Sequence, residues 1–350
     1  MKALLLVGGQ GTRLRPLTIH TPKSIVPIFN RPFLNYQLDL IKQVPEIDEV
    51  ILSLNYQPKR IEDVFGDGRS SGIKIRYIVE PTPLGTAGGI RYASEGVADT
   101  LVVFNGDVLT QIDLAAIVAL HRERQAKATI VLTPVENPSA YGLVETDASG
   151  NILRFVEKPK ADEITCNTIN AGIYVLEPST FDRIPKDRAS SIERSFFPSL
   201  VERGETFIAA IYEDYWIDIG TPEKYLQVHR DIMNGRYTAP PFDGRSDVAW
   251  ISADARIDEG ARLEAPLFID GGSVVKAGAR VGPYTVLGNE CQVDEDANVS
   301  GAIVWPGTKI GREADVRDCI VGRLSRIGRN ATVLHGVLGD ESSIAAYSRL

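Results

Sequence analysis

The stretch from Ile251 to Val299 reads ISADARIDEGARLEAPLFIDGGSVVKAGARVGPYTVLGNECQVDEDANV and carries an aliphatic residue at every sixth position. An α-helix repeats about every 3.6 residues and a strand every second residue, so neither produces this spacing. A six-residue period is typical of a parallel β-helix, in which each flat face of a three-sided prism sends one aliphatic side chain inward. The positions are Ile251, Ile257, Leu263, Ile269, Val275, Val281, Leu287, Val293 and Val299.

The series continues towards the C-terminus, now interrupted by single steps of five residues. In all, 17 aliphatic residues stay in register, which corresponds to between five and six three-sided coils. The recurring step of five shortens the same edge of the prism each time. The pattern resembles the left-handed β-helix of hexapeptide-repeat proteins. The later positions are Val304, Ile310, Val316, Val321, Ile327, Val333, Leu338 and Ile344.

Residues 1–233 follow a different pattern, in which short apolar runs alternate with amphipathic stretches. This alternation is typical of a Rossmann-like α/β domain with a mostly parallel sheet, and the later strands predict a β-rich insertion. Residues 234–248 are rich in Gly, Pro and polar residues and predict a linker before a β-helix domain at 249–350. We expect strands at 2–7, 50–54, 73–79, 101–104, 129–133, 142–146, 152–157, 170–176 and 207–211, and helices at 33–43, 58–65, 86–93, 114–125 and 222–233.

Composition excludes several classes of protein. The net charge is −8 and no long basic run occurs, which argues against a nucleic-acid surface. The apolar run at 3–7 is far too short to cross a membrane. Cys166, Cys291 and Cys319 are widely spaced and form no C-x-x-C motif, which favours a reducing compartment. We therefore expect a cytoplasmic protein without nucleic-acid or membrane partners.

A glycine cluster, GGQG at residues 8–11, follows the first expected strand. Glycines let successive backbone amides approach an anion, although a plain tight turn would use the same residues. A Walker loop is absent, and a dinucleotide fingerprint would need a third glycine where Leu14 stands. Pro16 and Pro22 prevent an immediate helix, while Arg15 and neighbouring cations add positive charge. On an acidic protein, such a loop predicts a polyphosphate ligand.

A series of motifs gives this chain a family resemblance. GGQGTRLRPLTIHTPKSIVPIFNRP, PLGTAGG, FNGDV, YGLVE, FVEKP, NAGIY, SIERSFFP and WIDIGTP occur in this order over nearly the whole chain. Together they resemble the nucleoside-diphosphate-sugar pyrophosphorylases, also called sugar-phosphate nucleotidyltransferases, and within them most closely the mannose-1-phosphate guanylyltransferases. Ser24 stands where that family commonly has proline, which affects only the local stiffness of the loop.

The resemblance implies a reaction between two phosphate esters. A sugar 1-phosphate oxygen attacks the α-phosphate of a nucleoside triphosphate and releases pyrophosphate, so positioning and charge neutralisation dominate catalysis. It implies that Arg13 and Lys23 neutralise the triphosphate, and that Asp107 and Asp218 bind Mg²⁺. Both aspartates follow strand-like runs, and each could alternatively be an ordinary turn or cap residue.

The resemblance also implies two groups of binding residues. Gly85 would let a flat nucleobase lie close to the backbone, although Thr86 could simply cap a helix there. Residues for the nucleotide are Leu6, Gly8, Gly9, Gly11, Thr12, Arg13, Leu84, Gly85, Thr86, Asn105 and Gly106. Residues for the sugar phosphate are Tyr141, Gly142, Glu157, Lys158 and Asn170, of which Lys158 would meet the phosphate.

Several alternatives stay open at this point. The leading hypothesis is synthesis of GDP-mannose from GTP and mannose 1-phosphate. A glucose 1-phosphate enzyme using dTTP, ATP or UTP, and a catalytically silent regulatory paralogue, are the others. We interpret the β-helix as an assembly or regulatory module that supports a homo-oligomer, and His335 as a face or corner residue rather than an acyltransferase histidine. A chain ending near Met233 would then keep the site.

Overall fold

The computed structural model describes residues 1–157, 160, 162 and 164–350. These residues divide into two compact units. Unit 1 comprises Met1–Gln10 and Leu34–Trp216, and unit 2 comprises Gly11–Phe33 and Ile217–Leu350. The residues after the first glycines therefore cluster with the C-terminal part of the chain. The domain boundaries expected from the sequence stay a prediction, because compact units and sequence domains are defined differently.

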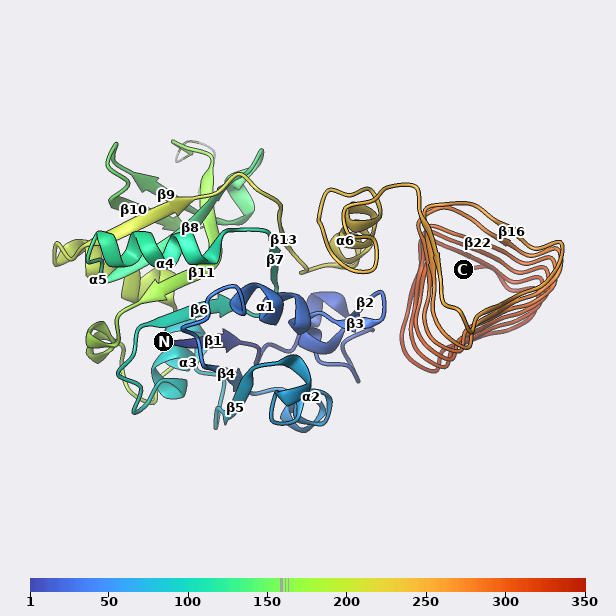
Figure 1. Ribbon diagram of the computed structural model, residues 1–350, viewed down its shortest axis with the longest axis horizontal. Coiled ribbons are helices and arrows are strands. Elements are labelled where there is room, and N and C mark those ends of the chain that lie inside the picture. Colours follow the sequence, from blue (N-terminus) through green and yellow to red (C-terminus); the bar gives the residue numbers. More distant parts are fainter. Residues whose placement is uncertain (158–159, 161, 163) are drawn as a thin grey trace. The chain divides into compact units, whose positions relative to one another are not determined.

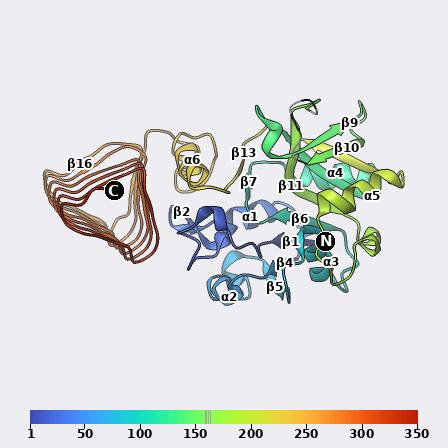
Figure 2. The same cartoon turned by 180° about the vertical axis from the view of Figure 1, so that it is seen from behind.

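Unit 1 is built on a nine-stranded mixed sheet (Figures 1 and 2). Its parallel part has the order β6-β1-β4-β5. All six residues of β4 are buried, as expected of a parallel strand that is covered on both faces. The bounds are β1 (Lys2–Leu6), β4 (Glu49–Leu54), β5 (Lys74–Val79) and β6 (Leu101–Asn105), with helices α1 (Leu34–Ile41), α2 (Pro58–Phe65), α3 (Gly85–Ala93) and α4 (Leu114–Glu123).

The rest of this sheet is mostly antiparallel. Strand β11 pairs antiparallel with β6, β8 and β9, whereas β12 runs parallel to β8. This is the β-rich insertion that the sequence predicts, and β10 continues it as an edge strand. The bounds are β8 (Ala128–Pro134), β9 (Gly142–Thr146), β10 (Ile152–Glu157), β11 (Thr168–Leu176) and β12 (Phe207–Ile211), with helix α5 (Phe197–Glu202). Strands β7 (Val108–Thr110) and β13 (Trp216–Asp218) form a separate two-stranded sheet.

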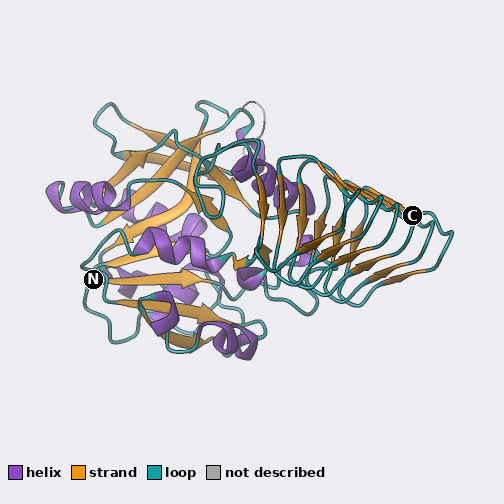
Figure 3. Cartoon of the chain, turned by 45° about the vertical axis from the view of Figure 1, so that its right-hand side comes forward, coloured by secondary structure: helices purple, strands orange, loops and turns teal. Residues whose placement is uncertain are grey.

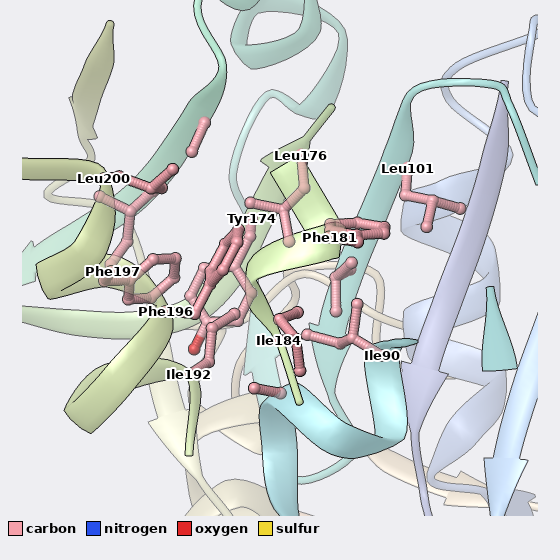
Figure 4. Packing of buried hydrophobic residues seen from close by; sticks show 14 of the residues in the cluster. Ile90, Leu101, Tyr174, Leu176, Phe181, Ile184, Ile192, Phe196, Phe197 and Leu200 are labelled. Carbon is pink, nitrogen blue, oxygen red and sulfur yellow. The ribbon is translucent and has the colours of Figure 1, made fainter. Parts of the chain in front are cut away.

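A hydrophobic cluster packs α3 and the segment around Phe181 and Ile184 against the sheet of unit 1. Figure 4 shows Ile90 of α3 beside Phe181 and Ile184, with Tyr174 of β11 nearby. The Tyr174 ring meets Phe197 edge-on, with ring centroids 5.1 Å apart. Because α3 begins at the candidate nucleotide site, this packing fixes one wall of that site.

The β-helix in unit 2 confirms the six-residue pattern. Figure 3 shows its short strands stacked coil on coil, and they form three parallel sheets, two of six strands and one of five. All strands pair in parallel with the coils above and below, for example Ile310 with Ile327. Thirteen of the 17 aliphatic positions are buried in one cluster, whereas Ile251, in the first coil, is exposed.

The strands of the three sheets are short. The first sheet contains β14 (Ala249–Ile251), β17 (Leu267–Ile269), β20 (Thr285–Leu287), β23 (Ile303–Val304), β26 (Ile320–Val321) and β29 (Val337–Leu338). The second contains β15 (Arg256–Ile257), β18 (Val274–Val275), β21 (Gln292–Val293), β24 (Lys309–Ile310), β27 (Arg326–Ile327) and β30 (Ser343–Ile344). The third contains β16 (Arg262–Leu263), β19 (Arg280–Val281), β22 (Asn298–Ser300), β25 (Asp315–Arg317) and β28 (Thr332–Leu334).

The five-residue steps all fall at one corner of the prism, where the chain leaves the third sheet for the first. Gly301, Asp318 and His335 occupy this corner, with φ values of 61°, 50° and 57°. The left-handed backbone makes the turn. His335 is an exposed corner residue, which agrees with the structural interpretation made from the sequence.

Unit 2 also contains Gly11–Phe33, here called the basic loop, and helix α6 (Pro222–Met233). Thr221 caps α6 by accepting a hydrogen bond from the Lys224 amide, as the sequence predicts. The loop carries short 3₁₀ turns at Thr12–Leu14 and Lys23–Ile25 and the hairpin β2 (Pro27–Ile28) and β3 (Arg31–Pro32). The expected linker is packed, since Phe242 within it is fully buried.

No helix among the described residues is long and apolar enough to cross a membrane.

Candidate functional site

A pocket of about 260 Å³ opens in unit 1 at the carboxyl ends of β1, β4 and β5. Open α/β sheets bind ligands at this edge, because the loops diverge there. Five residues that the sequence assigned to the nucleotide line the pocket, and Asn55, Glu80 and Pro83 complete its wall. The five are Leu6, Gly8, Gly9, Gly85 and Thr86.

Glu80 is a buried carboxylate in this wall, with 9% of its surface exposed. Ser53 donates its hydroxyl hydrogen to Oε1 at 2.7 Å, and the Leu84 amide donates to Oε2 at 2.9 Å. Each carboxylate oxygen has a second lone pair, so both can accept one further hydrogen bond from a ligand. The pocket therefore presents a fixed hydrogen-bond acceptor beside its glycines.

The N-terminus of α3 forms the floor of the pocket. Its N-cap residue is Leu84, and Thr86 lies inside the helix, where its hydroxyl oxygen accepts from the Ile192 amide at 2.7 Å. Thr86 is thus not the cap that the plainer interpretation expected. Gly85 has a φ of 69° and lines the pocket, whereas the Leu84 side chain is buried and does not.

The glycine loop leaves backbone donors available. In the described part of the chain, no amide from Gly8 to Thr12 donates to a backbone carbonyl. Such amides can bind an anion, as the sequence predicted for this loop. Gly106, also assigned to the nucleotide, instead donates its amide to the Leu6 carbonyl at 3.0 Å and so ties β6 to β1.

A second group of predicted residues lies at the β9 and β11 end of unit 1. Tyr141 meets the Trp216 indole edge-on, with centroids 5.6 Å apart, and Trp216 donates its ring N–H to the Ala171 carbonyl at 2.9 Å. Asn170 donates to the Tyr174 hydroxyl at 2.9 Å. Gly142 begins β9 opposite Glu157 of β10.

One residue predicted to contact the sugar phosphate, Lys158, lies outside the described residues.

Asn105 ends β6, and its backbone carbonyl accepts from the Gln37 side chain at 2.9 Å. Its side-chain oxygen is buried and has no hydrogen-bond partner among the described residues. An unsatisfied acceptor of this kind costs free energy unless a ligand or water supplies a donor.

In unit 2, the basic loop meets the segment that follows β13. The guanidinium of Arg13 lies over the backbone of Gly220, where an added Cβ would be 2.9 Å from Nη2. The Thr18 hydroxyl donates to the Gly11 carbonyl at 2.7 Å, and the same glycine faces Lys23. The loop thereby brings two predicted phosphate-binding cations, Arg13 and Lys23, into one folded unit.

Asp218, a predicted metal ligand, forms an ion pair with Lys224 of α6. Asp107 follows β6 in unit 1. The described residues contain no cluster of three His, Cys, Asp or Glu side chains that could hold a metal by themselves. Mg²⁺ usually keeps several waters and binds substrate phosphates with only one or two carboxylates, so the oxygen donors of an aspartate such as Asp107 or Asp218 suit Mg²⁺, whereas structural zinc sites use Cys and His.

Glu80, Asn55, Pro83, Trp216 and Lys224 are the residues that sequence reasoning missed. Glu80 and Asn55 each directly follow a strand, which is the signal that singled out Asp107. That rule could have found both. Lys224 does not follow a strand and so could not be found by this rule. It lies in the first turn of α6, and the position of that turn brings it to Asp218.

Comparison with known proteins identifies two family models. The model described as "Nucleotidyl transferase" matches residues 2–235, and the model described as "GMPPB C-terminal domain" matches residues 263–348. The first covers the nine-stranded sheet, the glycine loop and α6. The second covers most of the β-helix.

Curated relatives match most of the chain. A mannose-1-phosphate guanylyltransferase of Mycobacterium tuberculosis is 38% identical over 88% of this chain and 80% of its own length. A probable mannose-1-phosphate guanylyltransferase 1 of Oryza sativa is 37% identical over 88% of this chain and 87% of its own length. A UTP–glucose-1-phosphate uridylyltransferase of Synechocystis is 33% identical over 89% of this chain and 84% of its own length.

Proposed function

The chain belongs to the nucleotidyl transferase family, and on that premise we propose that it makes GDP-mannose from GTP and mannose 1-phosphate. It is a sugar-1-phosphate nucleotidyltransferase. A phosphate oxygen of the sugar attacks the α-phosphorus, the bond to the bridging oxygen breaks, and pyrophosphate leaves. No proton needs to be removed from the attacking phosphate, and no covalent protein intermediate is needed.

The observation that carries the choice of base is the Glu80 carboxylate in the wall of the pocket. Guanine presents N1–H and the N2 amino group side by side, so it offers two donors to a carboxylate. Uracil and thymine present one N–H between two carbonyl oxygens, and adenine presents an acceptor beside its amino group. The Glu80 carboxylate is buried, and two protein donors hold it in place. It therefore favours guanine over the other bases.

The phosphates are assigned to the glycine loop and its cations. Amides near Gly8 and Gly11 would bind phosphate oxygens, and Arg13 and Lys23 would stabilise the charge that develops on pyrophosphate. Asp107 and Asp218 would hold Mg²⁺, which neutralises phosphate charge and helps to align the reacting groups. Lys224 forms an ion pair with the Asp218 carboxylate.

The remaining assignments concern the sugar and the assembly. Tyr141, Gly142 and Asn170 are proposed to contact the sugar, together with Glu157, and Lys158 its phosphate. A homo-oligomer is supported by the end strands of the three β-helix sheets, which pair on one side only among the described residues and could pair with other chains. A reducing, cytoplasmic setting is supported by three unpaired thiols.

A pyrophosphate-release panel tests this function. GTP, ATP, UTP and dTTP are each combined with mannose, glucose and N-acetylglucosamine 1-phosphates in the presence of Mg²⁺. We expect GTP with mannose 1-phosphate to give the highest kcat/KM. A maximum for UTP with glucose 1-phosphate would favour the activity named for the Synechocystis relative. Binding of nucleotide sugars without turnover of any pair would favour the regulatory paralogue.

A further inference from the structure

Trp305 of the β-helix is a fully buried indole in the fourth coil, directly after β23. Its ring N–H donates to the hydroxyl oxygen of Tyr225 at 3.0 Å. Tyr225 belongs to α6, and its ring meets the Trp305 ring nearly perpendicularly. A buried indole N–H needs an acceptor, so this bond fixes the direction of the Tyr225 hydroxyl.

The Tyr225 hydroxyl in turn donates to the Pro27 carbonyl in β2. Burial raises the pKa of this phenol, which therefore keeps its proton and remains a donor. Its oxygen accepts from Trp305 while its hydrogen goes to Pro27. Hence β-helix, α6 and basic loop form one hydrogen-bonded chain within unit 2. Pro27 lies two residues after the 3₁₀ turn that carries Lys23.

A second bond from α6 reaches the same hairpin. His229 is fully buried, and its Nε2 accepts from the Phe29 amide at 3.2 Å. Its Nδ1 lies 2.8 Å from the Tyr225 carbonyl, so the proton sits on Nδ1 and Nε2 is free to accept. Phe29 has a positive φ of 54°, a conformation that costs free energy and needs such support.

The Phe29 ring is also packed by the β-helix. It contacts Phe268 of β17 at a centroid distance of 5.2 Å and Phe242 at 5.1 Å. Further along the loop, Pro16 lies against the turn at Gly339, where an added Cβ would be 3.1 Å from the proline Cβ. The β-helix thus supports the basic loop at both ends, near Pro16 and near Phe29.

We propose that Trp305 is a positioning residue for the transferase reaction and that it acts through Tyr225 on the loop segment of Lys23. The proposal rests on the function proposed above. It gives the β-helix a role within each subunit, separate from assembly. When the Trp305 bond is lost, the Tyr225 hydroxyl can rotate, the hairpin at Pro27 loosens, and Lys23 no longer meets the leaving group in one orientation.

The test compares Trp305→Phe, Tyr225→Phe and the double variant in the full-length protein. Each replacement keeps an aromatic ring and removes one link of the hydrogen-bonded chain. We expect kcat to fall about tenfold in each single variant while KM for GTP changes less than about twofold, because positioning matters mostly in the transition state. The double variant should lose little more than either single variant, because both act through one path.

Hydrogen exchange provides a readout that does not depend on activity. Amides of residues 18–33 should exchange about tenfold faster in both single variants, while amides of the β-helix interior stay protected. Tyr347→Phe is the matched control, because it also removes one phenol hydroxyl, which accepts a hydrogen bond from Arg329 within the β-helix. It should leave exchange at residues 18–33 unchanged.

Two results would overturn the proposal: unchanged exchange in residues 18–33, or single-variant losses in kcat that multiply in the double variant. If Trp305→Phe does not fold, amide exchange at residues 18–33 in Tyr225→Phe decides. Failure of the proposed function has a different signature, namely no GTP turnover in the parent protein. The exchange experiment would still report on the chain from Trp305 to Pro27.

Discussion

Arg13 lies across the backbone of Gly220, so closely that a methyl group at Gly220 would be 2.9 Å from Nη2 and 3.1 Å from Cζ. The glycine follows Asp218 by two residues, so the cation and the predicted metal ligand are set by one short segment. This contact explains chemically why a residue without a side chain stands at position 220. Any larger residue would push the guanidinium aside.

Gly220→Ala tests this contact directly. We expect kcat to fall roughly 10- to 100-fold with a smaller change in KM, because a displaced guanidinium no longer stabilises charge in the transition state. Gly336→Ala is the control, since an added Cβ there meets its nearest neighbour at an ordinary 3.4 Å. Steady-state kinetics with pyrophosphate detection measure both. Equal, near-parental rates would mean that Arg13 acts from another position.

Glu80→Gln tests the choice of base. The glutamine side chain has one acceptor oxygen where the carboxylate has two. Its NH₂ group would face the hydrogen-bond donors of Ser53, Leu84 and guanine and could not accept from them. We expect kcat/KM for GTP to fall roughly 10- to 100-fold, and for UTP to fall much less. Ser53→Ala keeps the carboxylate and should change the GTP-to-UTP ratio by less than about threefold. An unchanged ratio in Glu80→Gln would contradict the assignment.

Asp107→Asn and Asp218→Asn test the metal assignment. Each should lower turnover at least about a hundredfold and raise the Mg²⁺ concentration needed for half-maximal rate. Asp218→Asn also breaks the ion pair with Lys224. Lys224→Met separates the two effects, because it removes the ion pair and keeps the carboxylate. The exposed Asp214→Asn serves as control, and near-normal rates in both test variants would show that the metal binds elsewhere.

His229 predicts a pH dependence of stability. Burial lowers the pKa of His229 to about 4, whereas an unfolded histidine titrates near 6.5. The unfolded chain therefore binds the proton first, and the free energy of unfolding falls as the pH drops from about 6.5 to about 4, by roughly 3 kcal/mol.

The measurement is denaturant unfolding between pH 4.5 and 7.5 for the parent and His229→Gln. The variant should lose part of the slope, because glutamine does not titrate. A variant slope identical to that of the parent would place the titration in other groups.

Removal of the β-helix gives a further prediction, and here the structure changes the sequence-based expectation. A chain ending at Met233 would lose Phe268 and Trp305, which pack on Phe29 and hold Tyr225. The rings of Phe29 and Tyr225 would then be exposed to water, which costs several kcal/mol. We expect such a chain to unfold at lower denaturant concentration and to lose activity. Full activity with a lower native mass would instead support a β-helix used for assembly alone.

The sequence predicts the architecture well, because both parts have a strong period. The strands and helices expected in unit 1 are confirmed to within about two residues at their ends, and α6 begins and ends where expected. Helix α5 was not expected. Strand β7 and the hairpin of β2 and β3 were not expected. They are two or three residues long, and Pro27 and Pro32 are poor strand formers, so no periodicity marks them.

The candidate site was predictable as residue types and only partly as geometry. Gly8, Gly85 and Thr86 line one pocket as expected, but Leu84, the N-cap residue of α3, is buried and does not line it. The hydrogen bonds from Trp305 to Pro27 span residues that are far apart in the chain. Local propensity carries no information about such pairs, since the fold alone brings them together.

The coil length of the β-helix has a consequence for how this protein can change in length. Register pairs Lys309 with Arg326 and Asp315 with Thr332, a repeat of 17 residues, whereas the earlier coils repeat every 18. A single inserted residue within a face would turn buried side chains outward, while a whole extra turn would leave every layer intact. Viable insertions and deletions should therefore come as complete turns, and only beyond Trp305 would they spare its link to α6.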